Sequence, residues 1–166
     1  ISNDDIKKAI KKYNLKEDSI KILLPARVTE WKGHLILVDA VSQLFKKKIL
    51  NIEVLFFGPD QNKLLKEKIE NSIRQKNLQH IIKFYGSTDK MNLIYALSDI
   101  AISSSTDPEA FGRVSIEAQA MGKLIIASAH GGSQETIIEG KTGYLYSPKN
   151  PFELMEKISS AIDQKT

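Results

Sequence analysis

Short apolar runs rich in β-branched residues alternate with helical patterns along almost the whole of this 166-residue chain. Alternation of this kind is typical of βα units that build a parallel sheet covered by helices on both faces. The chain is long enough for one such domain, and its 42% apolar content is enough to fill a core. We expect strands at Ile20–Leu24, Ile52–Phe57, Ile81–Tyr85, Ile100–Ser103, Leu124–Ala127 and Gly143–Tyr146, and helices at Asp4–Tyr13, Leu35–Lys47, Asn62–Lys76, Lys90–Ala96, Gly112–Met121, Ser133–Ile138 and Pro151–Asp163. The sequence therefore predicts a three-layer α/β domain with a parallel sheet.

The loops that follow the expected strands carry many of the glycine and polar residues of the chain. These loops are Pro25–Gly33, Gly58–Gln61, Gly86–Asp89, Ser104–Phe111 and Ser128–Gly132. In an open parallel sheet, ligands bind at the carboxyl ends of the strands, which is where these loops gather. The sequence therefore predicts a ligand site at that end of the sheet.

The positive charge of the chain is carried almost entirely by lysine. The formal net charge is +4, and only three of the 24 basic residues are arginines. Lysine spread over helices is typical of a solvated surface, whereas nucleic-acid-binding domains use arginine and exposed aromatic residues more often. Nucleic-acid binding, which the isoelectric point of about 9.1 would otherwise suggest, is therefore the weakest functional alternative.

The sequence contains no pattern for a membrane span, a disulfide framework or a metal centre. It has no apolar run of 18 or more residues, no signal-peptide pattern and no cysteine. His34, His80 and His130 lack the spacing and the carboxylate neighbours of a metal site. We expect no metal, no cofactor and a cytoplasmic location, at most peripheral to the inner face of a membrane. Because the chain opens at Ile1 rather than at methionine, we also expect it to be a piece of a longer protein.

The segment from Asp107 to Gly122 places two carboxylates on either side of a glycine that opens a predicted helix. The first N–H groups of a helix lack intrahelical partners and carry its positive dipole end, so the turn around Gly112 could receive a phosphate. Gly112 has no Cβ, which allows a ligand to approach closely. Glu109 would lie in the loop before this anion site, and Glu117 about one turn inside the helix. We expect one acid to reach the reacting end of a ligand and the other its sugar hydroxyls.

A second set of candidate ligand-binding side chains follows the first expected strand. Arg27 and Lys32 lie in one ligand-facing loop. An arginine fork and a lysine charge aimed at the same place suit a diphosphate, because they offset the charge that grows on a departing nucleoside diphosphate. The alternative is a pair of ordinary surface cations, with Arg27 bridging Glu30.

Both acids also have ordinary structural interpretations. Glu117 lies four residues after Arg113 and could simply form an ion pair along the helix. Glu109 could be a first-turn acid that the helix dipole favours. Neither acid is specific when taken alone.

Three further features are open to two interpretations each. The pair Gly131-Gly132 could frame a sugar or merely turn the chain. Tyr85, at the end of the third strand, could flank a base or serve packing alone. Trp31 could touch a ligand or cover the edge of the domain.

Between Ile20 and Tyr146 the chain resembles the retaining, family-four glycosyltransferases. The residues that carry the resemblance are Arg27, Lys32-Gly33, Glu109, Phe111-Gly112, Glu117, Ala118, Gly122, Gly131-Gly132, Glu135 and Gly143. Such enzymes have two Rossmann-like domains that face each other across a cleft, the GT-B fold. The resemblance implies that residues 1–166 form the C-terminal, donor-binding domain and that the N-terminal, acceptor-binding domain is absent from this chain.

The resemblance also implies roles for individual residues. Arg27 and Lys32 would hold the donor diphosphate, Glu117 the ribose and Glu109 the transferred sugar. Backbone amides would contact the phosphate and the sugar hydroxyls, and they belong to Phe111, Gly112, Arg113 and Val114. Similar enzymes lack an evident protein nucleophile on this half, so Glu109 is assigned to positioning and charge stabilisation. The implied reaction moves a sugar from a nucleotide-diphosphate sugar to an acceptor with retention and without a metal.

Some positions depart from the family pattern and leave the donor open. Ala26, Ser104 and Leu124 stand where glycine, proline and proline are usual, and these changes affect loop geometry rather than charge. A sugar-nucleotide epimerase or a phosphorylase would share the architecture, but the sequence shows neither a histidine-rich site nor a cofactor lysine. The remaining alternative is a non-catalytic Rossmann-like binding or scaffold module.

Overall fold

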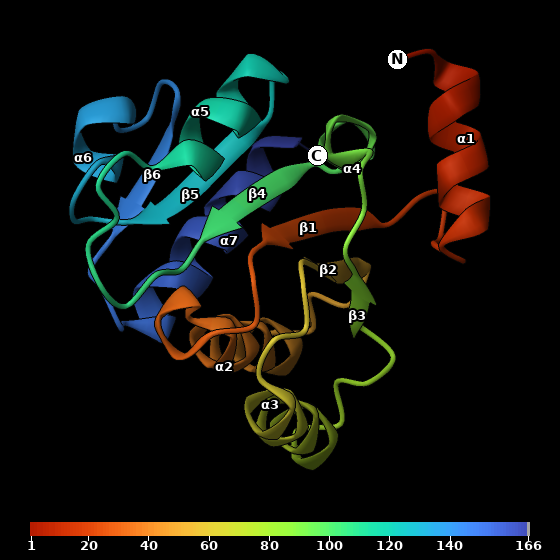
Figure 1. Cartoon of the computed structure of the whole chain (residues 1–166), viewed down its shortest axis with the longest axis horizontal. Coiled ribbons are helices and arrows are strands. Elements are labelled where there is room, and N and C mark those ends of the chain that lie inside the picture. Colours follow the sequence, from red (N-terminus) through yellow and green to blue (C-terminus); the bar gives the residue numbers. More distant parts are fainter. Residues whose placement is uncertain (166) are drawn as a thin grey trace.

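The structure is a computed structural model that describes residues 1–165, and it consists of one parallel sheet between two layers of helices (Figure 1). The strands are β1 (Ile20–Pro25), β2 (Ile52–Phe57), β3 (Ile82–Gly86), β4 (Ile100–Ser103), β5 (Leu124–Ser128) and β6 (Gly143–Tyr146). The helices are α1 (Asn3–Lys12), α2 (His34–Lys46), α3 (Lys63–Gln75), α4 (Met91–Leu97), α5 (Arg113–Ala120), α6 (Ser133–Thr136) and α7 (Pro151–Lys165), with a 3₁₀ turn η1 (Glu30–Lys32) before α2. The predicted three-layer α/β architecture is therefore confirmed.

The predicted elements agree with the observed ones to within a few residues. The largest differences are two residues: α6 ends at Thr136, earlier than the expected Ile138, and α7 continues to Lys165, beyond the expected Asp163. Ile137 leaves the helix because it adopts an extended conformation and is buried in the core. The turn η1 lies in a segment that was predicted to be a loop.

Local polar residues set where several helices begin. Ser2 accepts a hydrogen bond from the Asp5 amide, and the Asp5 side chain accepts one from the Ser2 amide, which closes a capping box on α1. Asn62 caps α3 by accepting a hydrogen bond of 3.0 Å from the Leu65 amide. These caps fix the chain as it enters the helices on each side of the sheet.

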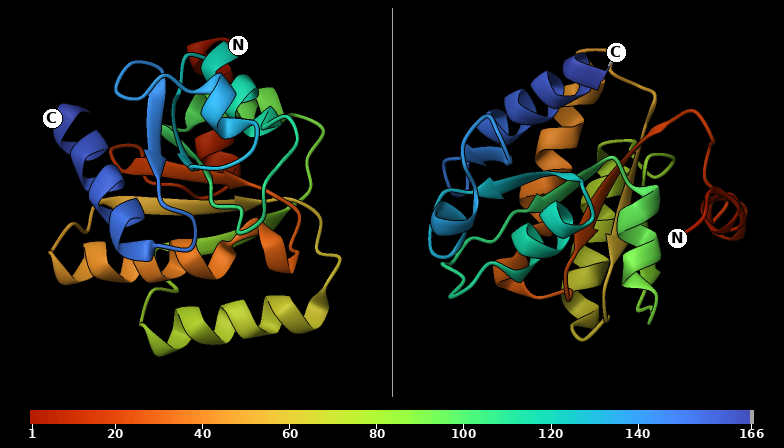
Figure 2. Two further views of the ribbon diagram at one scale, coloured as in Figure 1. Left: turned by 90° about the vertical axis from the view of Figure 1, so that its left-hand side faces the viewer. Right: turned by 90° about the horizontal axis from the view of Figure 1, so that it is seen from above.

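The two faces of the sheet pack against different helices, as the two turned views show (Figure 2). Ile22 and Leu24 of β1 join a core with α2, α3 and α7, while Leu23 between them joins a core with α1, α4 and α5. This alternation follows from the two-residue period of a strand. Strands buried on both faces read as continuous apolar runs, which is why the sequence revealed them clearly.

The strand order β3-β2-β1-β4-β5-β6 reverses direction between β1 and β4. From β1 the chain adds β2 and then β3 on one side. It then crosses back, so that β4 pairs with the other side of β1, and β5 and β6 follow on that side. All of these strands remain parallel. Ligands in open α/β sheets bind in the crevice outside the carboxyl ends of the strands at such a reversal. The loops after β1 and β4, which carry the predicted cations and Glu109, flank this crevice. Within residues 1–165, no helix is long and apolar enough to cross a membrane.

Candidate functional site

A cavity of about 970 Å³ lies at the carboxyl ends of the strands, over the reversal between β1 and β4. It is formed by the loops after β1, β2, β3 and β4 together with α4 and α5. All of the predicted site residues except Tyr85 line it, namely Arg27, Lys32, Glu109, Phe111, Gly112, Arg113, Val114 and Glu117. The topology therefore brings together cations and acids that are up to 90 residues apart in the sequence.

Lys32 and Glu109 form a mostly buried ion pair in the wall of this cavity. The Lys32 Nζ lies 2.5 Å from Oε1 of Glu109, and about 15% of each side chain is exposed. Ser105 donates a second hydrogen bond of 2.6 Å to the same Oε1. Burial alone would raise the pKa of Glu109, but the hydrogen bonds from Lys32 and Ser105 hold its pKa below the ordinary value. Glu109 is therefore ionised at neutral pH, and it precedes α5 rather than lying in its first turn.

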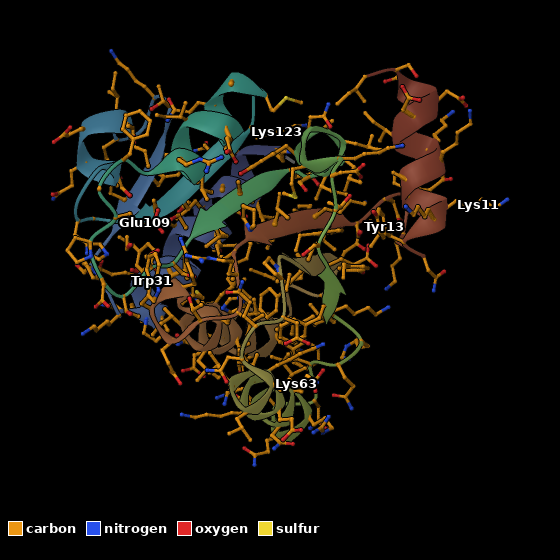
Figure 3. All side chains as sticks on the ribbon, viewed as in Figure 1. Lys11, Tyr13, Trp31, Lys63, Glu109 and Lys123 are labelled. Carbon is orange, nitrogen blue, oxygen red and sulfur yellow. The ribbon has the colours of Figure 1, made fainter. Side chains whose placement is uncertain are left out.

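Trp31 and the turn η1 orient Lys32. The Lys32 Nζ lies 4.1 Å from the centroid of the Trp31 ring, in a cation–π arrangement. Trp31 and Glu109 lie on the same side of the molecule, where the loops after β1 and β4 meet (Figure 3). Trp31 thus contacts a predicted ligand-binding cation as well as lining the cavity.

The loop after β4 is tied directly to the loop that carries Lys32. The Ser104 hydroxyl donates hydrogen bonds to the carbonyl oxygens of Lys32 and Gly33, at 3.1 and 3.0 Å. The Thr106 amide donates to the Trp31 carbonyl at 2.8 Å. A Cβ on Gly33 would overlap the Ser104 backbone, so the two loops meet at a position where only glycine fits.

The first turn of α5 lines the cavity. Gly112 precedes the helix with a φ of +67°, and no side chain caps the turn. The N–H groups of Arg113 and Val114 therefore have no acceptor within the helix. Together with the helix dipole they favour an anion at this end of α5.

Glu117 is held by two different partners. The Tyr95 hydroxyl donates a hydrogen bond of 2.9 Å to Oε2 of Glu117, and Arg113 donates to Oε1 at 3.3 Å. The predicted ion pair with Arg113 is therefore present, and Glu117 also lines the cavity. Tyr95 was not predicted, because it lies 22 residues away on α4 and nothing in its local sequence indicates a ligand site.

Behind the acidic loop lies the glycine pair Gly131-Gly132. The Gly132 amide donates to the Glu109 carbonyl at 2.7 Å. A Cβ on Gly131 would fall 2.9 Å from the Glu109 nitrogen, and one on Gly132 would fall 2.5 Å from the Phe111 carbonyl carbon. The pair packs backbone against backbone and supports the loop that carries Glu109, and neither glycine is among the residues that line the cavity.

His130 adds to this support. Its Nε2 lies 2.9 Å from both the Ser105 carbonyl oxygen and the Ser128 hydroxyl. It thereby joins the loops after β4 and β5, next to the serine that binds Glu109. Among residues 1–165, no three His, Cys, Asp or Glu side chains gather in a metal-binding arrangement.

Two predicted residues are placed differently from the rest. Arg27 is exposed at the cavity wall and forms no ion pair within the described chain, so the alternative of a bridge to Glu30 is not observed. Tyr85 lies outside the cavity lining. Its ring stacks on Phe57 with a centroid separation of 4.9 Å and meets Tyr13 edge-on. Tyr85 thus packs against its aromatic neighbours in this structure, and the aromatic residues that line the cavity are Trp31, Phe57, Tyr95 and Phe111.

Comparison with known proteins identifies the family. The family described as Glycosyl transferases group 1 matches residues 5–166, so the chain belongs to this family of transferases. It is 32% identical over 162 residues to the lipopolysaccharide 1,2-N-acetylglucosaminetransferase of Salmonella typhimurium, covering 92% of this chain and 42% of the relative.

Solved structures agree with this assignment. A glycosyltransferase from Rickettsia africae superposes with a TM-score of 0.94 at 36% identity, covering 98% of this chain and 42% of that one. Anabaena Alr3699/HepE in complex with UDP superposes with a TM-score of 0.91 at 27% identity, covering 100% of this chain and 45% of that one. The fold is therefore the Rossmann-like domain of GT-B glycosyltransferase structures. The chain spans about two fifths of the length of these proteins.

Proposed function

We propose that this chain is the donor-binding domain of a glycosyltransferase that takes a sugar from a nucleotide-diphosphate sugar. The observation that carries the proposal is the convergence of Arg27, Lys32, the open end of α5 and Glu117 on one cavity. Two cations and a helix N-terminus suit a diphosphate, and an acid beyond them suits ribose hydroxyls. UDP is the first nucleotide to test, because the Anabaena structure is a complex with UDP.

Charge stabilisation of the leaving group is the proposed chemical contribution of this domain. As the bond to the sugar breaks, negative charge grows on the departing diphosphate, and fixed cations lower the barrier most when they are already in place. Lys32 meets this requirement because Trp31 and Glu109 hold its Nζ before any ligand binds. Arg27 has no competing ion pair within residues 1–165 and is free to turn toward the phosphates.

Glu109 is proposed to position the transferred sugar. Ser105 and Lys32 both bind Oε1, which leaves Oε2 available to accept hydrogen bonds from sugar hydroxyls. Its role is positioning and charge stabilisation rather than covalent attack, and we propose transfer with retention and without a metal. The acceptor would bind the N-terminal domain of the longer enzyme, and closure of the two domains would limit hydrolysis of the donor.

The proposal is tested by calorimetric titration of the chain with UDP, GDP and ADP, with and without EDTA. We expect one diphosphate to bind with a dissociation constant on the order of 0.1 to 1 mM, unchanged by the chelator. Arg27→Ala and Glu117→Ala should each weaken binding roughly tenfold or more, because each removes a hydrogen bond to a charged group. Arg74→Ala and Glu67→Ala, both exposed on α3, serve as controls.

Two results would contradict this function. Equal binding by wild type and by Arg27→Ala would favour a non-catalytic module in which these charges are surface pairs. Salt-dependent affinity for oligonucleotides in place of nucleoside diphosphates would favour a nucleic-acid binder. Retention is tested on the full-length enzyme by following the anomeric proton of donor and product by NMR.

A further inference from the structure

Tyr95 stands apart from the other cavity residues because it is both buried and hydrogen-bonded to a predicted ligand-binding acid. The residue is only 2% exposed, although it is among those that line the cavity. That hydroxyl donates to Oε2 of Glu117 at 2.9 Å. Tyr95 belongs to α4 and Glu117 to α5, so the bond joins two helices that cover the same face of the sheet.

The two partners of Glu117 differ in how firmly they are held. Tyr95 is anchored in the core, while the side chain of Arg113 is 82% exposed and meets Oε1 at 3.3 Å. Exposed ion pairs within one helix contribute little, because water and salt compete with them. A buried hydroxyl that donates to a carboxylate is stronger and fixes the side-chain torsions of the acid. Tyr95 therefore holds Oε2 of Glu117 in place, whereas Oε1 is bound by Arg113, which a ligand can displace.

We propose that Tyr95 is a positioning residue that fixes Glu117 so that its Oε1 is presented to the ribose hydroxyls of the donor nucleotide. Arg113 gives way when those hydroxyls arrive. This inference rests on the proposed function, because it assumes that Glu117 binds the ribose. Burial, followed by the neighbouring Glu117 charge, raises the pKa of Tyr95, so the phenol keeps its proton and remains a donor.

The inference makes a prediction that a general packing role does not make. Removing the Tyr95 hydroxyl should free Glu117 to turn toward Arg113 and weaken contacts with the ribose. Contacts with the diphosphate involve Arg27, Lys32 and the start of α5, and none of these touches the Tyr95 hydroxyl in the described structure. Loss of the hydroxyl should therefore reduce affinity only for nucleotides that carry ribose hydroxyls.

The test compares UDP with 2′,3′-dideoxyuridine diphosphate on wild type and Tyr95→Phe by calorimetry. We expect wild type to prefer UDP and Tyr95→Phe to lose about five- to tenfold of that preference, less than a full hydrogen bond to a charged group is worth, because Glu117 is released rather than removed. The affinity for the dideoxy nucleotide should stay within about twofold of wild type. Tyr146→Phe is the matched control, because Tyr146 is equally buried but lies outside the cavity lining, and it should change neither affinity.

The outcomes separate this inference from the proposed function. Failure of wild type to bind UDP, or to prefer it over the dideoxy nucleotide, would overturn the ribose role of Glu117 itself. A wild-type preference that Tyr95→Phe retains in full would overturn only the role of Tyr95. Equal weakening of both nucleotides in Tyr95→Phe would show a merely structural role and also overturn it.

A second variant keeps the inference testable should Tyr95→Phe fail to fold. Arg113→Ala removes an exposed side chain and leaves the Tyr95 bond to Glu117 intact. Because Arg113 no longer competes for Oε1 of Glu117 while Tyr95 still holds Oε2, we expect the preference for UDP over the dideoxy nucleotide to rise by about twofold. Loss of that preference would mean that Arg113, and not Tyr95, positions Glu117.

Discussion

Replacing Gly131 with alanine tests whether the glycine pair supports the acidic loop. Gly131 has a φ of +59°, and a Cβ there would fall 2.9 Å from the Glu109 nitrogen and closer still to its carbonyl oxygen. Gly140 has a similar φ of +77° but nothing within 4 Å of the added carbon. Both variants therefore incur the cost of a left-handed alanine, but only Gly131→Ala must also displace the backbone of the Glu109 loop.

The comparison of the two variants isolates the steric cost. We expect Gly140→Ala to lower the free energy of unfolding by about 1 kcal/mol, from backbone conformation alone. A forced contact in a packed region typically adds about 1–3 kcal/mol, so Gly131→Ala should lose roughly 2–4 kcal/mol in total. For a domain of this size, each kcal/mol lowers Tm by about 2–4 °C, so the two midpoints should differ by several degrees.

Urea unfolding followed by circular dichroism measures this difference, and UDP titration measures its consequence at the site. Because the displaced loop carries Glu109, we expect Gly131→Ala to bind UDP more weakly than Gly140→Ala does. Equal stability of the two variants, or an unchanged affinity for UDP in Gly131→Ala, would refute the idea that the glycine pair holds this loop in place.

Three further predictions concern single side chains. Trp31→Leu should weaken UDP binding about two- to tenfold, because it removes the cation–π contact with Lys32. Trp31→Phe keeps an aromatic ring and should bind UDP with most of the wild-type affinity in the same titration. The buried Tyr146 hydroxyl has no hydrogen-bond partner within residues 1–165. Tyr146→Phe should therefore leave the free energy of unfolding unchanged or raise it by up to about 1 kcal/mol. A clearly lower free energy of unfolding in urea would contradict this prediction. Burial, followed by the charge of Lys32, lowers the pKa of His34 to about 4. Between pH 6.5 and 4 the unfolded chain therefore binds a proton that the folded chain does not, so the free energy of unfolding should fall as the pH falls through that window. His34→Phe should reduce the dependence of the free energy of unfolding on pH between pH 6.5 and 4. An unchanged pH dependence would contradict the assignment to His34.

The fold was predictable because the strands and helices carry strong local signals. Ile22, Leu23 and Leu24 are apolar in succession because the strand is buried on both faces, and that pattern separates a central strand from a helix. Ile137 marks the limit of such signals, because its burial in the core ends α6 earlier than local sequence indicated.

The candidate site was predictable where a charge stands in a strand-end loop or near the start of the helix that follows such a loop. Arg27, Lys32, Glu109 and Glu117 fall in this class, and the structure gathers all four around one cavity. The partner Arg113 of Glu117 was predictable from its spacing along the helix, but partners from other elements were not. Tyr95 reaches Glu117 from a different helix, through packing that no local pattern encodes.

The role of the glycine pair was equally hidden in the sequence. Gly131 and Gly132 lack a Cβ, which allows the backbone of Glu109 and Phe111 to pack directly against them. The sequence does not show which backbone segments pack against a glycine. The ligand-binding role of Tyr85 stays a prediction, and its stacking on Phe57 outside the cavity lining is a contact that the local sequence does not indicate.

The most direct test of the donor-site account is a crystal structure of this chain with UDP. The account predicts diphosphate oxygens within hydrogen-bond distance of Arg27, Lys32 and the amides of Arg113 and Val114, with the ribose hydroxyls on Glu117. UDP bound away from this cavity, or bound in it with the diphosphate turned away from both cations, would contradict the account.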